Sequence, residues 1–164
     1  AAAAAAMTWL LLSWIHGKPS SLGFVSGAVA GLVAITPGAG YVTPMAAIVI
    51  GAIGGALCYG MMLSRIKKGL DESLDAWSIH GMGGLWGALA TGIFAVAAVN
   101  GASGLIEGNV HQFVANAVGA FSALIYAFVV TYILAVIVDK TIGLRVTEEE
   151  EYVGLDISQH GERA

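Results

Sequence analysis

Five apolar segments separated by short polar connections constrain the fold of this chain more than any other feature. They cover residues 1–15, 21–36, 44–63, 73–99 and 111–138. An α-helix rises 1.5 Å per residue, so about 20 residues cross a hydrocarbon core of about 30 Å. The segments 73–99 and 111–138 reach that length, whereas segment 1–15 is short, and we expect its start to be truncated.

The composition points to a membrane. Charged residues make up 11% of the chain and the mean hydropathy is +0.81, whereas soluble domains carry roughly 25% charged residues. The 23 glycines add a second indication, because helices in lipid pack through small residues that let their backbones approach. We therefore predict an all-α membrane protein, a polytopic transmembrane helix bundle, with five spans in residues 1–139 and a tail over 140–164.

The basic residues predict the orientation of this bundle. If the five segments cross in turn, all seven basic residues fall on one side of the membrane: Lys18, Arg65, Lys67, Lys68, Lys140, Arg145 and Arg163. Basic residues favour the cytoplasmic side. The tail 140–164 is therefore predicted to be cytoplasmic, in a multi-pass protein of the cell (inner) membrane that contacts lipid.

His80 is a titratable residue inside the apolar, glycine-rich stretch Asp75–Phe94, and such a residue in a membrane span is a functional-site hypothesis. Imidazole gives or takes a proton near neutral pH, and burial would favour its neutral form. The alternative is a histidine that only packs between helices. Asp75, Thr36 and Pro37 are structural candidates: Thr36-Pro37 either interrupts the second segment, as near transporter substrate sites, or simply ends a helix.

Three motifs in order carry a resemblance to a known family: Lys18–Pro37, Asp75–Gly84, and Gly143–Val146 with Gly154–Glu162. The chain resembles the ammonium transporter (Amt/Mep/Rh) family, in its bacterial and archaeal Amt branch. It is similar to helices seven to eleven, the C-terminal half, of an eleven-helix inverted-repeat fold. The resemblance implies a homotrimer, a pore in each subunit, a missing N-terminal half of the same protein, and a PII-type signal protein that binds the cytoplasmic face.

The resemblance also implies roles for individual residues. His80 looks like the second of two pore histidines, Val29 like an apolar pore-lining residue, and Ala76 like a further lining position that is often a larger aliphatic residue. Gly143, Arg145 and Asp156 belong to a tail pattern associated with regulation. From the residues themselves, Thr147 and the four glutamates after it could open a short helix.

These observations predict transport of ammonium or ammonia through a hydrophobic pore in which a histidine handles the substrate's proton. The alternative is an ammonium sensor or receptor of the same fold that signals through its tail. The sequence contains no converging nucleophile and base and no metal-ligand spacing, so we expect no enzyme activity, no cofactor and no metal site. It also contains no pattern that indicates nucleic-acid binding.

Overall fold

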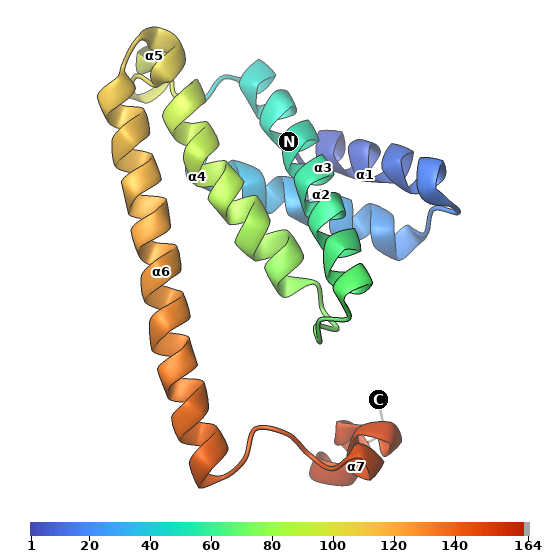
Figure 1. Ribbon diagram of the computed structural model, residues 1–164. Helices are drawn as coiled ribbons and strands as arrows, with labels where there is room; N and C mark the ends of the chain where they lie inside the picture. Colours follow the sequence, from blue (N-terminus) through green and yellow to red (C-terminus); the bar gives the residue numbers. More distant parts are fainter. Residues whose placement is uncertain (163–164) are drawn as a thin grey trace. The chain divides into compact units, whose positions relative to one another are not determined.

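The computed structural model describes residues 1–162, and within them the regular structure is entirely helical. Arg163 and Ala164, the end of the predicted tail, lie outside the described residues. The α-helices are α1 (Ala2–His16), α2 (Ser21–Ile35), α3 (Pro44–Lys68), α4 (Met82–Phe94), α5 (Ala97–Asn100), α6 (Val110–Thr141) and α7 (Glu148–Val153) (Figure 1). The 3₁₀ turns are η1 (Thr36–Gly38) and η3 (Leu105–Glu107), and the wider π-helical turns are η2 (Trp77–Gly81) and η4 (Asp156–His160). The all-α prediction is confirmed.

The chain divides into two compact units, each described by itself. Unit 1 comprises residues 1–121, and unit 2 begins at Ser122. The division falls inside α6. The first part of α6 belongs to unit 1 because Asn116 donates a hydrogen bond to the Ala88 carbonyl of α4 at 3.1 Å.

Residues at the helix ends explain where the helices begin and stop. The Ser20 hydroxyl accepts a hydrogen bond from the Gly23 amide at 3.0 Å and caps α2. Thr43 caps α3 in the same way, with Pro44 at its first position. Gly69 ends α3 at a φ of 63°, a left-handed conformation that favours glycine.

The fourth predicted segment, 73–99, is not one continuous helix. Asp75 has a φ of 53°, so regular helix starts only after it, and the first turn, η2, is wider than an α-helical turn. At the other end α4 stops at Phe94, and the Val96 amide donates to the Tyr41 carbonyl of the facing loop at 2.9 Å. Among residues 1–162, three helical stretches are long and apolar enough to cross a membrane: Ser21–Gly38, Pro44–Lys68 and Val110–Thr141.

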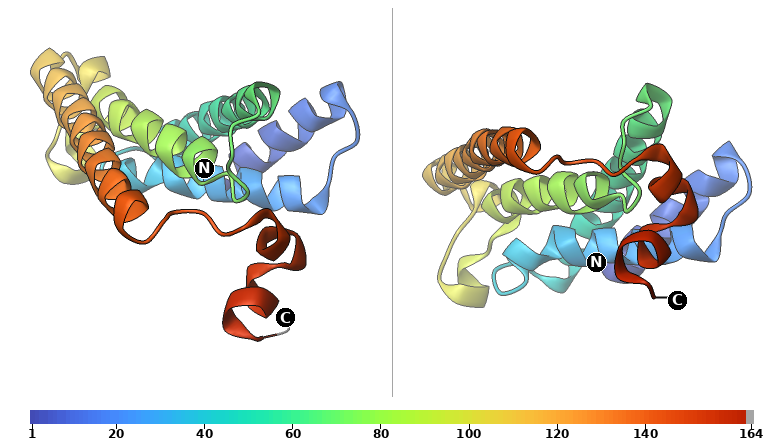
Figure 2. Two further views of the ribbon diagram at one scale, coloured as in Figure 1. Left: turned by 60° about the horizontal axis from the view of Figure 1, so that its bottom comes forward. Right: turned by 90° about the horizontal axis from the view of Figure 1, so that it is seen from below.

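Helices α1 to α4 pack by close approach of their backbones. Helices α1, α2 and α3 contact one another, and α4 contacts α2 and α3 (Figures 1 and 2). Ala5 of α1 is where three of these helices meet. A Cβ atom added to Gly31 of α2 would lie 2.7 Å from the Ala5 Cβ, and one added to Gly55 of α3 would lie 2.7 Å from the Ala5 carbonyl oxygen. A larger residue at either glycine would push these helices apart.

A second close approach occurs at Ala34 of α2, which is 1% exposed. A Cβ atom added to Gly54 of α3 would lie 2.8 Å from the Ala34 Cβ. One added to Gly87 of α4 would collide with the Ala34 carbonyl group. The Trp86 indole donates a hydrogen bond to the Ile50 carbonyl at 3.0 Å and joins α4 to α3 beside this contact.

We expect Gly55→Ala to lower the free energy of unfolding by about 1–3 kcal/mol, because the added methyl group meets α1 backbone that has no room to retreat. Gly60→Ala in the same helix is the matched control, since a Cβ atom there has no neighbour within 4 Å. Thermal unfolding of the complete gene product that carries this chain, in detergent, measures both. Equal unfolding temperatures for the two variants would contradict the packing described for Ala5.

In unit 2, the predicted short helix after Thr147 is confirmed as α7. The Thr147 hydroxyl accepts from the Glu150 amide at 3.3 Å, and the Glu150 carboxylate accepts from the Thr147 amide at 3.0 Å. This reciprocal pair is a capping box. The carboxylate of Glu150 accepts hydrogen bonds from the backbone amide and from the hydroxyl of Thr147. These bonds, with the backbone contribution the larger, hold the pKa of Glu150 below its usual value.

The sign of this shift predicts how α7 responds to pH. The cap contributes fully above the ordinary glutamate pKa of about 4.3 and is lost as the pH falls through the lowered pKa of folded Glu150. Helical Cα chemical shifts of residues 148–153 should therefore diminish between pH 7 and pH 3. Glu150→Gln keeps an acceptor oxygen that does not titrate, so this loss should be smaller, whereas Glu149→Gln should behave as the wild type. An identical response of the two variants would contradict the assignment to Glu150.

Candidate functional site

His80 lies in η2, the wide turn that begins the α4 region. Asp75 precedes this turn in a left-handed conformation, which few residues other than glycine adopt. The Ile79 amide donates to the Asp75 carbonyl at 2.8 Å and closes the first turn. Single wide turns of this kind often mark functional sites in helices.

The His80 side chain is exposed, so the expected burial is wrong for the described chain. The turn packs on its neighbours through Ser78 and Ile79, which are 0% and 6% exposed. His80 therefore points away from the contact with α2 and α3. Within the part of the chain that the structure describes, no side chain forms a hydrogen bond or ion pair with His80.

The other two predicted pore residues lie near η2 but differ in burial. Val29 of α2 is half-buried and packs against a cluster of buried side chains that includes Ile79. Ala76 is exposed and immediately precedes η2. Ala76 and His80 thus belong to one exposed stretch of chain, while Val29 supports the buried side of the same turn.

An apolar stripe continues along α2 beside Val29. Its members recur at helical spacing, and three of them are strongly exposed: Leu22 at 76%, Val25 at 55% and Leu32 at 55%. Residues spaced in this way share one helix face. The α2 stripe, defined here as Leu22, Val25, Val29 and Leu32, is therefore a long apolar face that is half-buried at Val29 and exposed at its other three members.

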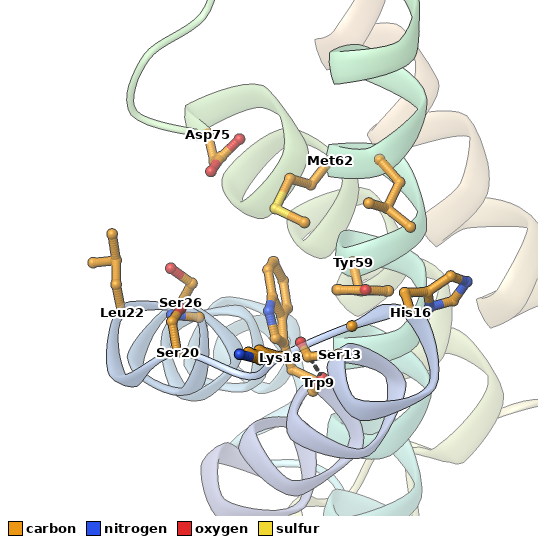
Figure 3. A pocket seen from close by; sticks show the side chains of 13 residues that line it. Trp9, Ser13, His16, Lys18, Ser20, Leu22, Ser26, Tyr59, Met62 and Asp75 are labelled. Carbon is orange, nitrogen blue, oxygen red and sulfur yellow. Dashed lines mark hydrogen bonds between the residues drawn. The ribbon is translucent and has the colours of Figure 1, made fainter.

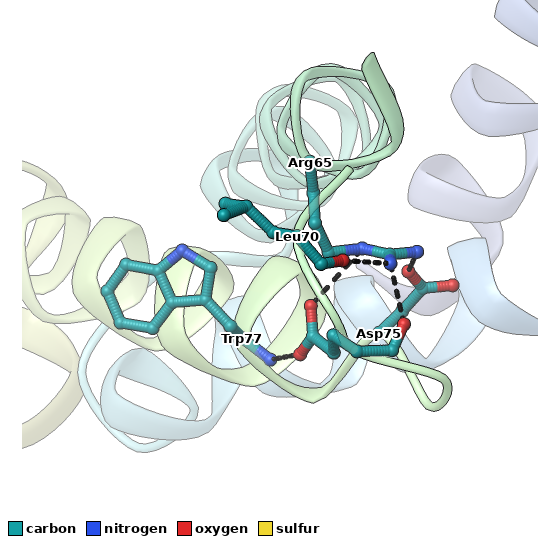
Figure 4. Close-up of polar contacts among 5 residues, drawn as sticks. Arg65, Leu70, Asp75 and Trp77 are labelled. Atoms are coloured by element: carbon teal, nitrogen blue, oxygen red, sulfur yellow. Dashed lines mark hydrogen bonds and ion pairs between the residues drawn. The ribbon is translucent and has the colours of Figure 1, made fainter. Parts of the chain in front are cut away.

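Arg65, near the end of α3, holds the segment that leads into η2 (Figure 4). Its side chain is only 13% exposed. It donates to the Asp75 carboxylate at 2.7 Å and to the Glu72 carbonyl at 2.6 Å, and its Nε lies 3.3 Å from the Glu72 carboxylate. We call Arg65, Glu72 and Asp75 the arginine clamp.

The clamp extends to the first residue of the wide turn. The Glu72 carboxylate accepts a hydrogen bond from the Trp77 amide, so Glu72 caps this helix start. The Trp77 ring lies against Gly81, because a Cβ atom at Gly81 would collide with it. Asp75 keeps the structural role expected for it.

Arg65 entered the predictions only as a positive charge that indicates orientation, and the clamp was not predicted. The available signal was an arginine ending one apolar segment and two carboxylates opening the next across a short connection. A further α3 contact with η2 was also missed: Cys58, fully buried, lies with its Sγ 3.6 Å from the Ile79 carbonyl oxygen. Cys58 and Arg65 are seven residues apart and therefore share a face of α3.

A pocket of about 400 Å³ opens beside the clamp (Figure 3). Its walls combine the aromatic rings of Trp9 and Tyr59, whose centroids are 5.3 Å apart, with serine hydroxyls from α1 and α2. Lys18 and Asp75 contribute charges of opposite sign. Lys18 and Arg65, from two different connections, thus lie at the same end of unit 1.

The pocket at the opposite end of unit 1 is lined by uncharged residues. Pro37 lines this second pocket, of about 430 Å³, together with Tyr41, Thr91, Gln112 and Asn116. Thr36 and Pro37 form η1 directly after α2, and the Thr36 hydroxyl donates to the Leu32 carbonyl at 2.7 Å. These two residues therefore end the helix by a tightened turn and do not interrupt it.

The predicted regulatory residues lie in unit 2. Gly143 follows α6 with a φ of 82°, Arg145 forms an exposed ion pair with Glu151 at 3.3 Å, and Asp156 begins η4. In this unit the Gln159 amide also donates to the Glu150 carboxylate at 2.7 Å, which joins η4 to α7. All three predicted residues are exposed.

Known proteins share both the sequence and the fold. The chain is 57% identical over 163 residues to the ammonium transporter Amt1 of Archaeoglobus fulgidus, which covers 99% of this chain and 42% of that protein. It is 50% identical over 168 residues to an ammonium transporter of Bacillus subtilis, covering 100% of this chain and 42% of that protein. The chain thus spans about two fifths of the length of these relatives.

Solved structures agree with these relatives. The crystal structure of Saccharomyces cerevisiae Mep2 matches with a TM-score of 0.84 and 34% identity, over 90% of this chain and 35% of that one. A protein described as a sensor Amt protein matches with a TM-score of 0.84 and 31% identity, over 96% of this chain and 39% of that one. The profile of the Ammonium Transporter Family covers residues 1–164. The chain, with its several apolar helices, belongs to the Ammonium Transporter Family of multi-pass membrane proteins.

Proposed function

We propose that this chain forms part of a pathway that carries ammonium or ammonia across the membrane, with His80 handling the proton of the substrate. The observation that carries the proposal is the exposed imidazole in a wide turn, which has no side-chain partner among residues 1–162. The names of the relatives, which are ammonium transporters, support the substrate.

The chemistry explains why an apolar pathway would contain a histidine. Ammonium and potassium ions are similar in size, so coordination alone separates them poorly. Moving a bare ion into an apolar passage carries a large desolvation cost, whereas neutral ammonia avoids most of it. A neutral imidazole is at once a donor and an acceptor, so His80 can exchange hydrogen bonds with ammonia. Potassium has no proton to leave behind.

The exposed surfaces indicate what completes the pathway. The outer residues of the α2 stripe, Ala76 and His80 are each exposed, and the relatives are more than twice as long as this chain. We propose that the complementary half of the same protein covers these residues and contributes a second histidine opposite His80. The complete protein is proposed to be a homotrimer.

We further propose that the end of unit 1 that carries Lys18 and Arg65 faces the cytoplasm, because basic residues favour that side. The C-terminal tail is proposed to be cytoplasmic by the same charge rule. Gly143, Arg145 and Asp156 are exposed in the tail and are proposed to contribute to regulation, with a PII-type signal protein as the partner.

A sensor or receptor is the second candidate function. The structural similarity to a sensor Amt protein, at a TM-score of 0.84, favours it specifically. In a sensor, ammonium would bind and the tail would relay occupancy to a partner. The two functions differ in whether ammonium moves through the protein, so a flux measurement separates them.

We expect proteoliposomes containing the complete gene product to give an ammonium-evoked current, and His80→Ala either to abolish this current or to admit potassium. The physical reason is the loss of the group that accepts and returns the proton. His111→Ala is the matched control, because His111 is also an exposed histidine but lies at the start of α6. Solid-supported-membrane electrophysiology measures all three proteins.

An unchanged current together with unchanged potassium exclusion in His80→Ala would overturn the proton-handling role. Ammonium binding without any current in the wild type would instead favour the sensor. Equal losses in His80→Ala and His111→Ala would show that the effect is not specific to the wide turn.

A further inference from the structure

We infer that Arg65 is a positioning residue for His80: the arginine clamp fixes where the wide turn starts, and thereby sets the direction in which the imidazole points. This inference rests on the proposed function of His80 and adds residues that lie outside the apolar region. It concerns unit 1 alone, and all of its contacts lie between residues 58 and 81.

The first step is the geometry of Arg65 itself. All three guanidinium nitrogens face the connection between α3 and η2: one Nη donates to the Leu70 and Glu72 carbonyls, the other to Asp75, and Nε lies near the Glu72 carboxylate. The planar guanidinium offers several donors in fixed directions. A side chain that is 13% exposed and held in this way is a rigid support and not a mobile surface charge.

The second step is the conformation that Arg65 stabilises. Asp75 has a φ of 53°, which is uncommon for a residue other than glycine. Such a conformation persists where the surrounding contacts fix it. Two contacts fix it here: the ion pair with Arg65 at 2.7 Å and the hydrogen bond from the Ile79 amide to the Asp75 carbonyl at 2.8 Å. The backbone direction at Asp75 determines the direction in which η2 leaves.

The third step connects the clamp to His80. Glu72, oriented by Arg65, caps the Trp77 amide, and the Trp77 ring lies against Gly81, the neighbour of His80. On the buried side, the Cys58 thiol lies at 3.6 Å from the Ile79 carbonyl, next to His80 on its other side. His80 has no partner of its own among residues 1–162, so its direction is inherited from these neighbours.

The clamp should therefore act on selectivity without touching the substrate. Removing one member of a mostly buried ion pair leaves the other charge uncompensated. Without Arg65, Asp75 and Glu72 would turn toward water, the left-handed residue would relax, and η2 would start in a different direction. Small displacements of a reacting group cost much of its effect.

The test uses three variants of the complete gene product in proteoliposomes. Arg65→Gln removes the clamp, and Asp75→Asn removes the negative charge from its ion pair with Arg65 with almost no change in shape. Lys67→Gln is the matched control, because it removes the same charge from the same helix end at an exposed position. The readouts are the ratio of ammonium-evoked to potassium-evoked current, and hydrogen exchange of the amides of residues 75–82.

We expect Arg65→Gln and Asp75→Asn to lower this ratio by about tenfold or more and to speed exchange of the Trp77 amide. Lys67→Gln should leave both readouts unchanged. The double variant Arg65→Gln with Asp75→Asn should match Arg65→Gln within about twofold, because contacts in one network do not add.

Wild-type selectivity in Asp75→Asn and Arg65→Gln would overturn the inference, even if amide exchange rises, because the clamp would then hold the turn without directing His80. If Arg65→Gln fails to fold, the current ratio and the amide exchange of Asp75→Asn alone test the inference. An effect of His80→Ala without an effect of the clamp variants refutes only this inference. No effect of His80→Ala refutes the proposed function instead.

Discussion

Close approach of helix backbones at two alanines underlies the architecture of unit 1. Ala5 meets a glycine from α2 and one from α3, and Ala34 meets a glycine from α3 and one from α4. Side chains at these glycines would collide with carbonyl groups or methyl groups of the facing helix. Because small residues bring the helices into contact, the large apolar side chains are left to point outward, as in the α2 stripe. That outward apolar surface suits lipid or a further packed part of the protein.

This packing also determines which face of η2 is available. The α4 region meets α2 and α3 through Ser78, Ile79 and Gly87, so the opposite side, with His80, stays open. Charges gather at only one end of this arrangement, where the arginine clamp joins α3 to the wide turn. We therefore propose separate roles for these two parts. His80 on the open face of η2 contacts the substrate, and the arginine clamp holds His80 in position.

Much of this could be predicted from the sequence, and the exceptions have physical causes. Apolar length and glycine content predict a helical membrane bundle because those properties act locally. The break at Asp75 was missed because a left-handed aspartate depends on Arg65, which belongs to another helix. His80 is exposed in residues 1–162, and not buried as expected, because burial depends on what covers a face and these residues leave this one open. Glycine spacing likewise predicts close packing but does not identify Ala5 and Ala34 as the partners.

The central claim is that the exposed stretch with Ala76 and His80 borders the ammonium pathway, and thiol modification tests it most directly. Cys58 is fully buried, so a cysteine introduced at exposed Ala76 offers an accessible thiol. Val118→Cys, at a position 61% exposed on α6, is the control. The account predicts that a small methanethiosulfonate reagent blocks the ammonium-evoked current of Ala76→Cys and leaves that of Val118→Cys intact. A fully modified Ala76→Cys protein with an unchanged current would contradict it.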